Sequence, residues 1–207
     1  MIPSEAGRAA QRCGAVYFTR HCRTEWNDAG RLQGGHDIPL SAAGRDQARN
    51  LAQEVLGLGV GVLVTSTQQR AYETAAIIGE RCGARVVACN DLCEIRFGDL
   101  EGMTLAQCAA AYPDIMAAWR NAPDTVRFPG GDAVIDFEKR VAAGLRLTLG
   151  LLSEPALYVL HGGVLRMARC LLEERSVAEM NKEIIPNAAL YRLNALSDRV
   201  EMNFYVP

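Results

Sequence analysis

No apolar run in this chain of 207 residues reaches the ~18 residues that a membrane-spanning helix needs. The first dozen residues are mixed and polar, without the apolar core of a signal peptide. Neither sign of charge is in large excess, because the formal net charge is -2, so nothing draws the whole molecule to nucleic acid or anionic lipid. We therefore expect no membrane partner and no nucleic-acid partner, and any anion site must be local.

Paired cysteines are also missing. Seven cysteines are scattered along the chain, an odd number with no two of them separated by only two residues. This pattern favours reduced thiols in a cytoplasmic protein over a disulfide framework. Cys89 and Cys93 could be half of a metal site, but no second Cys or His pair follows at zinc spacing. We expect no metal and no cofactor.

Short apolar stretches alternate with segments of helical spacing. Strands are expected at 15–18, 60–64, 85–89 and 157–160, with two more at 189–193 and 200–206. The longest amphipathic segment, from 134 to 152, is typical of a helix. The alternation predicts the α/β class: a three-layer sandwich with a mostly parallel central sheet and helices on both faces. We expect a flexible tail over residues 1–12 and a single domain over 13–207.

Charged residues and histidines follow the expected strands directly. Arg20, His21 and Arg23 come after the first strand, and His161 follows the strand at 157–160. Ligands of parallel sheets bind beyond the carboxyl ends of the strands, so these residues would meet in one crevice. Arg70 lies in the first turn of an expected helix, where a cation opposes the helix dipole unless an anion is near. Since arginine donors match phosphate oxygens, the crevice is predicted to bind a phosphate or a similar dianion.

These residue types suit phosphoryl transfer. A neutral imidazole is a competent nucleophile near pH 7, because its unperturbed pKa is about 6.5. Positive groups stabilise the charge that spreads over the phosphoryl oxygens. A carboxyl group such as Glu94 could protonate the leaving oxygen and then activate a water, and Asp99 and Glu101 compete for that role. The sequence has neither a P-loop motif nor a cluster of acids for two metals.

Six sequence blocks, in order, carry a resemblance to one family. The block from Arg20 to Asn27 resembles the RHG-x-T-x-W-N signature of the histidine phosphatase superfamily, also called the phosphoglycerate mutase-like family. The other blocks lie at 32–48, 65–75, 92–102, 129–131 and 161–163. Together they span almost the whole chain after residue 12. The resemblance favours the phosphatase branch over the mutase branch.

The resemblance implies a role for each matched position. His21 would be the catalytic nucleophile that becomes phosphohistidine, Glu94 the catalytic proton donor, and His161 a catalytic residue that holds the phosphoryl oxygens. Five residues would bind the substrate: Arg20, Thr24, Asn27, Arg70 and Gly162. Thr24 and Asn27 could instead be ordinary turn and cap residues. Three residues are candidates for selecting the substrate: Arg23, Gln33 and His36. Members of this family need no metal for the step.

Several positions depart from the family pattern. Cys22 stands where glycine is usual; it could crowd the site, fill space, or react as a thiol beside two arginines. Arg23 stands where an acid or amide is common, and it could attract a second anionic group of the substrate or simply face solvent. Cys93 and Arg96 replace the arginine and the acid that commonly flank the proton donor.

The expected function is metal-independent hydrolysis of a small phosphomonoester through a phosphohistidine intermediate. The alternative function is that of a phosphoglycerate mutase or another phosphotransferase. It ranks lower because we expect this compact chain to lack the long insertion that shields the intermediate in the mutases it resembles. A weakly catalytic protein that binds phosphorylated ligands is the third hypothesis, motivated by Cys22 and the altered flanks of Glu94. Residues 95–130 are expected to cover a small phosphorylated substrate, and a homodimer is one candidate assembly.

Overall fold

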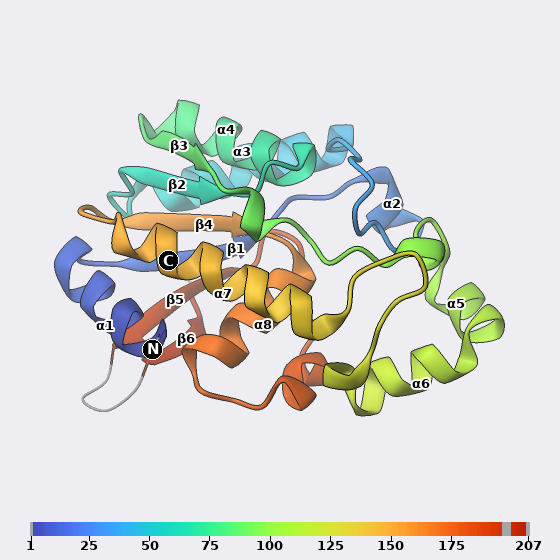
Figure 1. Ribbon diagram of the computed structural model, residues 1–207. Helices are drawn as coiled ribbons and strands as arrows, with labels where there is room; N and C mark the ends of the chain where they lie inside the picture. Colours follow the sequence, from blue (N-terminus) through green and yellow to red (C-terminus); the bar gives the residue numbers. More distant parts are fainter. Residues whose placement is uncertain (1, 196–199, 206–207) are drawn as a thin grey trace.

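The computed structural model describes residues 2–195 and 200–205, which form a six-stranded sheet with helices on both faces (Figure 1). The strands are β1 (Val16–Arg20), β2 (Val62–Thr65), β3 (Arg85–Ala88), β4 (Ala156–Leu160), β5 (Leu190–Ala195) and β6 (Val200–Phe204). The α-helices are α1 (Ile2–Cys13), α2 (Glu25–Asp28), α3 (Ala42–Leu56), α4 (Gln69–Cys82), α5 (Leu105–Ala111), α6 (Pro113–Asn121), α7 (Val134–Gly150) and α8 (Gly162–Leu172). Short 3-10 helices are η1 (Asn90–Leu92), η2 (Gly98–Leu100), η3 (Pro123–Thr125) and η4 (Val177–Lys182).

The sheet has the strand order β3-β2-β4-β1-β5-β6. Its first four strands pair in parallel, whereas β5 pairs antiparallel with both β1 and β6. The predicted fold class, a mostly parallel sheet between helical layers, is confirmed. The two C-terminal strands form the hairpin at the edge; the last residue of the predicted final strand, residue 206, lies outside the described residues.

The parallel strands supply side chains to two separate cores. Along β4, Tyr158 and Leu160 face the core under α1, α7 and α8, while Leu157 and Val159 face the core under α3 and α4. Successive side chains of a strand point to opposite faces, so a continuous apolar run is what a doubly covered strand requires. Figure 1 shows the two helical layers above and below the sheet. Each large apolar side chain buried in this way stabilises the fold by about 1.5–3 kcal/mol.

The N-terminal segment corrects one expectation. The sequence predicts a flexible tail over residues 1–12, whereas residues 2–13 form the helix α1. One face of this helix is buried, at intervals of three and four residues: Ile2, Ala6, Ala9 and Cys13. Arg12 then donates to the carbonyl oxygens of Leu152 (2.6 Å) and Leu149 (2.9 Å) at the end of α7. Small alanines give this face little hydrophobicity, which is why the pattern resembles a polar tail.

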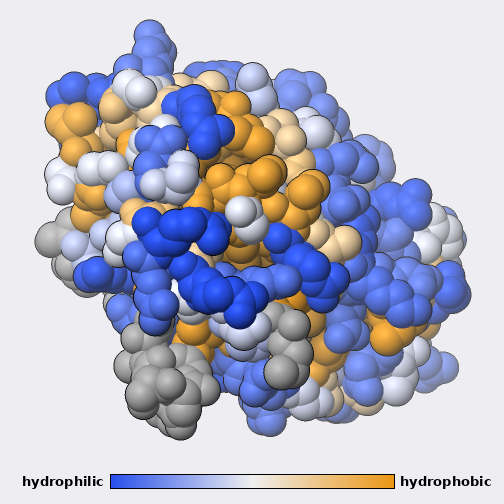
Figure 2. Space-filling model, turned by 60° about the vertical axis from the view of Figure 1, so that its left-hand side comes forward, coloured by the Kyte–Doolittle hydropathy of each residue, from blue (hydrophilic) through white to orange (hydrophobic). Residues whose placement is uncertain are grey.

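The carboxyl ends of the parallel strands determine where a site can lie. The arrow of β4 points toward the side of the molecule that carries α5 and α6 (Figure 1). Figure 2 brings the other side forward and shows hydrophobic side chains gathered among hydrophilic ones. The C-terminal end of α7 lies on this side; Leu147 of this helix and Leu151, which follows it, are exposed. No helix of the described residues has the length and apolar character needed to cross a membrane.

Candidate active site

A cavity of about 160 Å³ opens where β1 and β4 end. Its lining comes from the loop after β1, the start of α4, the loop after η1 and the start of α8. It includes seven of the residues predicted from the sequence: Arg20, His21, Asn27, Gln33, Arg70, Glu94 and Gly162. Segments far apart in the chain therefore converge in one crevice, as the carboxyl-end rule predicts.

His21 is fixed in one tautomer. Its Nδ1 lies 2.7 Å from the carbonyl oxygen of Cys22, which can only accept a hydrogen bond, so Nδ1 carries the proton and Nε2 keeps its lone pair. Its backbone is held by Leu160, whose carbonyl accepts from His21 N, and by Asn187, whose Nδ2 donates to His21 O. Burial, and then the charges of Arg20 and Arg70, hold the pKa of His21 well below its usual value. The ring is therefore neutral at pH 7.

Two arginines flank this histidine. Arg70, only 1% exposed, donates to the backbone carbonyls of His36 (2.7 Å) and Gly34 (2.9 Å). Arg20 donates through Nη1 to the carbonyl of Ile185 at 2.8 Å. In both arginines the buried Nε has no hydrogen-bond partner within the described residues. A buried N–H without a partner is costly, so both groups favour an anion in the cavity.

His161 follows β4 directly and is fully buried. Its ring centroid lies 5.3 Å from that of His21, and its Nε2 lies 2.7 Å from Oγ of Ser66. Its other nitrogen, Nδ1, has no partner in the described part of the chain. Burial, and then Arg70 and His21, hold the pKa of His161 well below its usual value. The predicted pair of histidines thus meets across the strand ends.

Glu94 brings a carboxylate to the same cavity. Its Oε2 accepts from the backbone N–H of Gly163 at 3.0 Å, and its Oε1 accepts from that of Ile95 at 3.1 Å. Its own N–H donates to Oε1 of Gln68 at 2.8 Å. Gln68 also donates through Nε2 to the carbonyl of Gly34, so this one amide joins two loops of the site.

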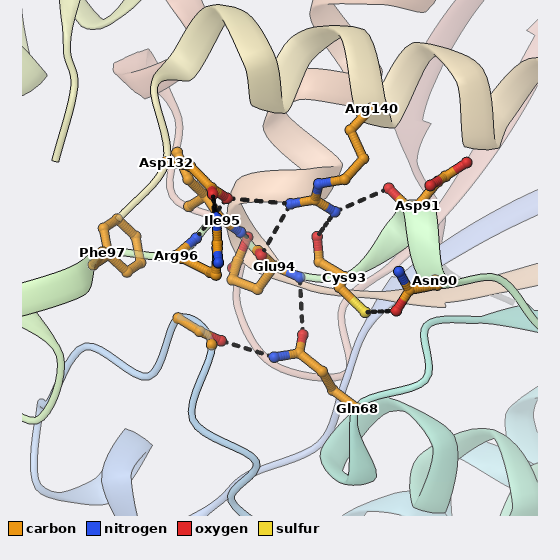
Figure 3. A network of polar contacts seen from close by, with 12 residues as sticks. Gln68, Asn90, Asp91, Cys93, Glu94, Ile95, Arg96, Phe97, Asp132 and Arg140 are labelled. Atoms are coloured by element: carbon orange, nitrogen blue, oxygen red, sulfur yellow. Dashed lines mark hydrogen bonds and ion pairs between the residues drawn. The ribbon is translucent and has the colours of Figure 1, made fainter. Parts of the chain in front are cut away.

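A second set of contacts, made by Arg140 and Asp132, holds the 91–96 segment that carries Glu94 (Figure 3). Arg140 of α7 donates to the carbonyl oxygens of Asp91 (3.1 Å), Cys93 (2.7 Å) and Glu94 (3.2 Å). It also pairs with Asp132, whose carboxylate accepts from the backbone N–H of Arg96. Figure 3 shows Gln68 and Arg140 on opposite sides of the segment that carries Glu94. A wider cavity of about 580 Å³ adjoins this segment, and Glu94 lines both cavities.

The two competing carboxylates have other surroundings. Glu101 accepts from the backbone N–H groups of Gly35 (2.7 Å) and Phe97 (2.9 Å) and pairs with His36. Asp99 is exposed and does not line the cavity. Within the described residues, Glu94 is therefore the one carboxylate that lines the cavity with His21.

Four predicted residues do not line the cavity: His161, described above, and three residues of the loop after β1. Thr24 is buried and caps α2, and its hydroxyl accepts from the backbone N–H of Asn27. Arg23 pairs with Asp28 at the surface and lines neither cavity. His36 lies 5.2 Å from the ring of Trp26 and pairs with Glu101 at 2.5 Å. The loop after β1 uses these side chains to fix its own shape, which local spacing alone does not distinguish from substrate binding.

The side chain of Cys22 lies away from the cavity. Its side chain is fully buried in the core under α3 and α4, and its backbone N–H donates to Oγ1 of Thr74 at 3.1 Å. Its φ is not positive, so the replacement of glycine causes no backbone strain there. Burial raises the pKa of the Cys22 thiol to about 12, which leaves the thiol protonated and inert.

The structure adds lining residues that the sequence analysis did not single out. Arg31 and Arg166 bring two more cations, and Phe97, Ile184 and Ile185 bring apolar surface. Arg166 had a signal in the sequence: it lies four residues after Gly162, hence on the same face of α8. The others depend on how remote loops pack. Among the described residues, no group of three His, Cys, Asp or Glu could hold a metal ion.

We expect acid to destabilise the fold through the two buried histidines. Their folded-state pKa values are lowered, so their contribution to stability is complete above the unfolded value of about 6.5 and is lost as the pH falls below it. Below this pH, each of the two histidines lowers the free energy of unfolding by about 1.4 kcal/mol per pH unit. Urea unfolding in phosphate-free buffer, between about pH 7.5 and 5.5, measures this. The variant His161→Asn should show a shallower pH dependence than the wild type; identical slopes would contradict the expectation.

Replacement of Gly163 tests the acid role that the sequence predicts for Glu94. A Cβ at this position would collide with Oε1 of Glu94, so Gly163→Ala must displace the carboxylate. A shift of about 1 Å in a catalytic group can cost about 100-fold in rate, which is the decrease in kcat that we expect. Gly150→Ala is the matched control, because a Cβ at that end of α7 meets nothing within 4 Å. Steady-state kinetics with an unchanged kcat for Gly163→Ala would show that Glu94 needs no such fixed position.

Comparisons with known proteins agree with this geometry. The family model of the histidine phosphatase superfamily (branch 1) matches residues 16–206. A putative phosphoserine phosphatase 2 of Hydrogenobacter thermophilus is 35% identical over 157 residues, which are 76% of this chain and 77% of that protein. A probable phosphoglycerate mutase GpmB of Yersinia enterocolitica is 33% identical, over 76% of this chain and 72% of its own.

A solved structure extends the likeness to three dimensions. It is a mycobacterial glucosyl-3-phosphoglycerate phosphatase in complex with VO3. It superposes with a TM-score of 0.80 at 29% identity and covers 93% of this chain and 98% of that one. With the family match over nearly the whole chain, the conclusion is that this protein belongs to the histidine phosphatase superfamily.

Proposed function

We propose that this protein hydrolyses a small phosphomonoester through a phosphohistidine on His21. One observation carries the proposal: within the described residues, the buried Nε atoms of Arg20 and Arg70 and Nδ1 of His161 have no hydrogen-bond partner. Both arginines line the cavity, and the ring of His161 lies 5.3 Å from the neutral imidazole of His21. Three such N–H or ring-nitrogen groups near one imidazole match the oxygens of a phosphoryl group. The relatives named as phosphatases support the same reaction.

The reaction proceeds in two balanced steps. In the first, Nε2 of His21 attacks phosphorus; a P–N bond forms, the ester P–O bond breaks, and the carboxyl group of Glu94 gives its proton to the leaving oxygen. In the second, a water attacks phosphorus, the P–N bond breaks, and the Glu94 carboxylate takes the proton of the water. Arg20, Arg70 and His161 hold the phosphoryl oxygens in both steps. The arginine charges supply the electrostatic stabilisation, so the proposal requires no metal and no cofactor.

Phosphate release in the presence of EDTA tests the proposal. We expect the wild type to release phosphate from at least one ester in a panel that includes phosphoserine, phosphoglycerates, sugar phosphates and nucleotides. EDTA should not lower the rate, because the positive charge at the phosphoryl group comes from the protein. Loss of activity in EDTA, restored by added metal, would overturn the metal-independent step. Absence of release from every ester would overturn the phosphatase assignment.

Phosphoglycerate mutase activity is the second candidate. A relative that is 33% identical is named a probable phosphoglycerate mutase, and the same phosphohistidine serves both reactions. The fate of the phosphoryl group distinguishes them. Isomerised phosphoglycerate without free phosphate would favour the mutase. The third hypothesis, a weakly catalytic binding protein, loses one of its motivations because the side chain of Cys22 packs away from the cavity.

Some expectations about the surroundings remain proposals. All seven cysteines are free, which supports a reducing compartment such as the cytoplasm. Residues 95–130 remain the segment proposed to cover the substrate: Phe97 lines the cavity, and α5 and α6 lie on the side toward which β4 points (Figure 1). The homodimer stays a prediction that size-exclusion chromatography with light scattering would test.

A further inference from the structure

Ser66 is a buried polar residue that the proposed reaction does not use. It follows β2 directly, as His21 follows β1 and His161 follows β4. Since β4 pairs in parallel with both β1 and β2, these three residues lie side by side at the carboxyl edge of the sheet. The side chain of Ser66 has no exposed surface and lines neither of the two cavities. Any role of Ser66 in the chemistry must therefore act through a neighbouring side chain.

That neighbour is His161. Oγ of Ser66 lies 2.7 Å from Nε2 of His161, although the two residues are 95 positions apart in the sequence. Both side chains are fully buried, so water does not compete for this hydrogen bond. A hydroxyl and a ring nitrogen can each be the donor, and the other partners of the two groups decide where the proton lies.

The hydroxyl proton of Ser66 has one acceptor. Oγ of Ser66 also accepts from the backbone N–H of Gln68 at 3.2 Å, because an amide N–H can only donate. Within the described residues, the other hydrogen-bond partner of this oxygen is Nε2 of His161. If Nε2 carried a proton, the hydroxyl hydrogen would be buried without an acceptor, which is costly. The contacts therefore favour a Ser66 hydroxyl that donates to an unprotonated Nε2.

The single proton of the His161 ring then lies on Nδ1. Burial, and then the charge of Arg70, hold the pKa of His161 well below its usual value, so the ring is neutral at pH 7. Nδ1 is the atom of this ring that has no hydrogen-bond partner in the described part of the chain. After burial, the groups that act most strongly on the ring are Arg70, His21 and Arg20. A buried N–H among these groups lacks an acceptor, which a phosphoryl oxygen supplies.

We propose that Ser66 is a positioning residue, whose hydroxyl holds His161 in the tautomer that donates from Nδ1 to a phosphoryl oxygen. The inference rests on the proposed phosphatase function and deepens it by assigning the donor atom. The opposite tautomer would present the lone pair of Nδ1 to an oxygen of a dianion, and a repulsion would replace the hydrogen bond. The carbonyl oxygen of Cys22 holds His21 in its own tautomer. One ring thus keeps Nε2 free to attack phosphorus, and the other keeps Nδ1 protonated to bind its oxygens.

Nitrogen-15 NMR of the wild type reads the tautomer directly, because protonated and unprotonated ring nitrogens have separate signals. The chain has three histidines, so the signals of His161 are those that vanish in His161→Asn. In phosphate-free buffer at about pH 7.5 we expect a protonated Nδ1 and an unprotonated Nε2. Ser66→Ala should convert His161 to a mixture of tautomers and leave the signals of His21 in place. A protonated Nε2 in the wild type, or a His161 unchanged by Ser66→Ala, would overturn the inference.

Turnover measures what the tautomer contributes. Ser66→Ala should lower kcat/KM by about 10- to 100-fold on any ester that the wild type hydrolyses, as expected when a hydrogen bond to a charged group is lost. Ser66→Thr retains a hydroxyl and should recover most of this loss.

Thr65→Val is the matched control for Ser66→Ala. It removes the neighbouring buried hydroxyl, which donates to the carbonyl oxygen of Val159 at 3.0 Å and not to a histidine. Thermal unfolding shows how much stability each variant loses, and Thr65→Val should keep kcat/KM close to that of the wild type. Equal losses of kcat/KM in Ser66→Ala and Thr65→Val would indicate a general packing effect and contradict the assignment. Full activity of Ser66→Ala would contradict it as well.

Binding of inorganic phosphate separates this inference from the proposed function. If the wild type hydrolyses no ester, the phosphatase assignment fails, but calorimetric titration with inorganic phosphate still measures how the site holds the anion. We expect Ser66→Ala to weaken phosphate binding by about 10- to 100-fold, and Thr65→Val to retain the affinity of the wild type. Equal affinities of the wild type and Ser66→Ala would overturn the role of Ser66 whether or not the protein is a phosphatase.

Discussion

His21→Ala should abolish turnover while the protein stays folded. Without the imidazole no P–N bond can form, and removal of a nucleophile typically costs roughly 10⁴-fold or more in kcat. The fold should survive, because the ring lies in a cavity and its main anchors are backbone contacts made by Leu160 and Asn187. Phosphate release and thermal unfolding, measured on the same preparation, check both halves of the expectation.

A control variant and direct detection of the phosphohistidine test whether the loss of turnover is specific to His21. His36→Ala removes a histidine of a neighbouring loop that lies outside the cavity, and most of the turnover should remain. Brief incubation of the wild type with a ³²P-labelled ester should leave label that survives alkali and is lost in acid, as expected for phosphohistidine. His21→Ala should retain no label. Full activity in His21→Ala would exclude the phosphohistidine route.

Glu94→Gln should slow the enzyme by about 10²- to 10⁴-fold on an alkyl phosphate, the usual contribution of a positioned acid or base. The amide keeps the size of the side chain, and its oxygen can still accept from Gly163, whereas its NH2 group replaces the oxygen that accepts from the backbone N–H of Ile95. With p-nitrophenyl phosphate, whose leaving group needs no proton, the first step should remain fast. The second step still needs a base to activate water, so phosphoenzyme should accumulate.

Rapid-mixing kinetics with p-nitrophenyl phosphate separate the first step from the second in Glu94→Gln. We expect a burst of about one equivalent of p-nitrophenolate from Glu94→Gln, followed by slow turnover. Glu101→Gln is a matched carboxylate change outside the cavity: the side chain organises Gly35 and Phe97, so it should lower stability more than it changes the dependence on the leaving group. If Glu94→Gln hydrolysed alkyl esters at the wild-type rate, the proton donor would have to be another group.

The parts of the site that follow from local rules could be predicted from the sequence. His21 and His161 come directly after apolar runs, and the carboxyl-end rule brings them together, which the 5.3 Å between their rings illustrates. Arg70 was conspicuous as a cation at a helix start. Glu94 could be predicted as the proton donor only through the family resemblance, because Asp99 and Glu101 are carboxylates of the same segment. What the fold decides is which of them faces the cavity.

The parts that depend on tertiary packing could not be predicted. Arg140 reaches the carbonyl of Glu94 across 46 residues of sequence, and no local pattern announces that contact. Ser66 lies against His161, a contact between residues that are 95 positions apart in the sequence. The helix α1 could not be predicted because small alanines make up much of its buried face. Each failure is a case in which packing between remote segments determined the role of a side chain.

The support of Glu94 by backbone groups has a consequence for how such an enzyme can diversify. Gln68 and Arg140 contact the N–H and carbonyl groups of the 91–94 segment, not its side chains. Substitution of Cys93 leaves these backbone contacts in place, whereas the side chain of Arg96 also pairs with Asp132, the partner of Arg140. Variation at Cys93 therefore reshapes the wider cavity that it lines while the support of Glu94 stays in place. The reaction and the choice of substrate can evolve at different rates within this one loop.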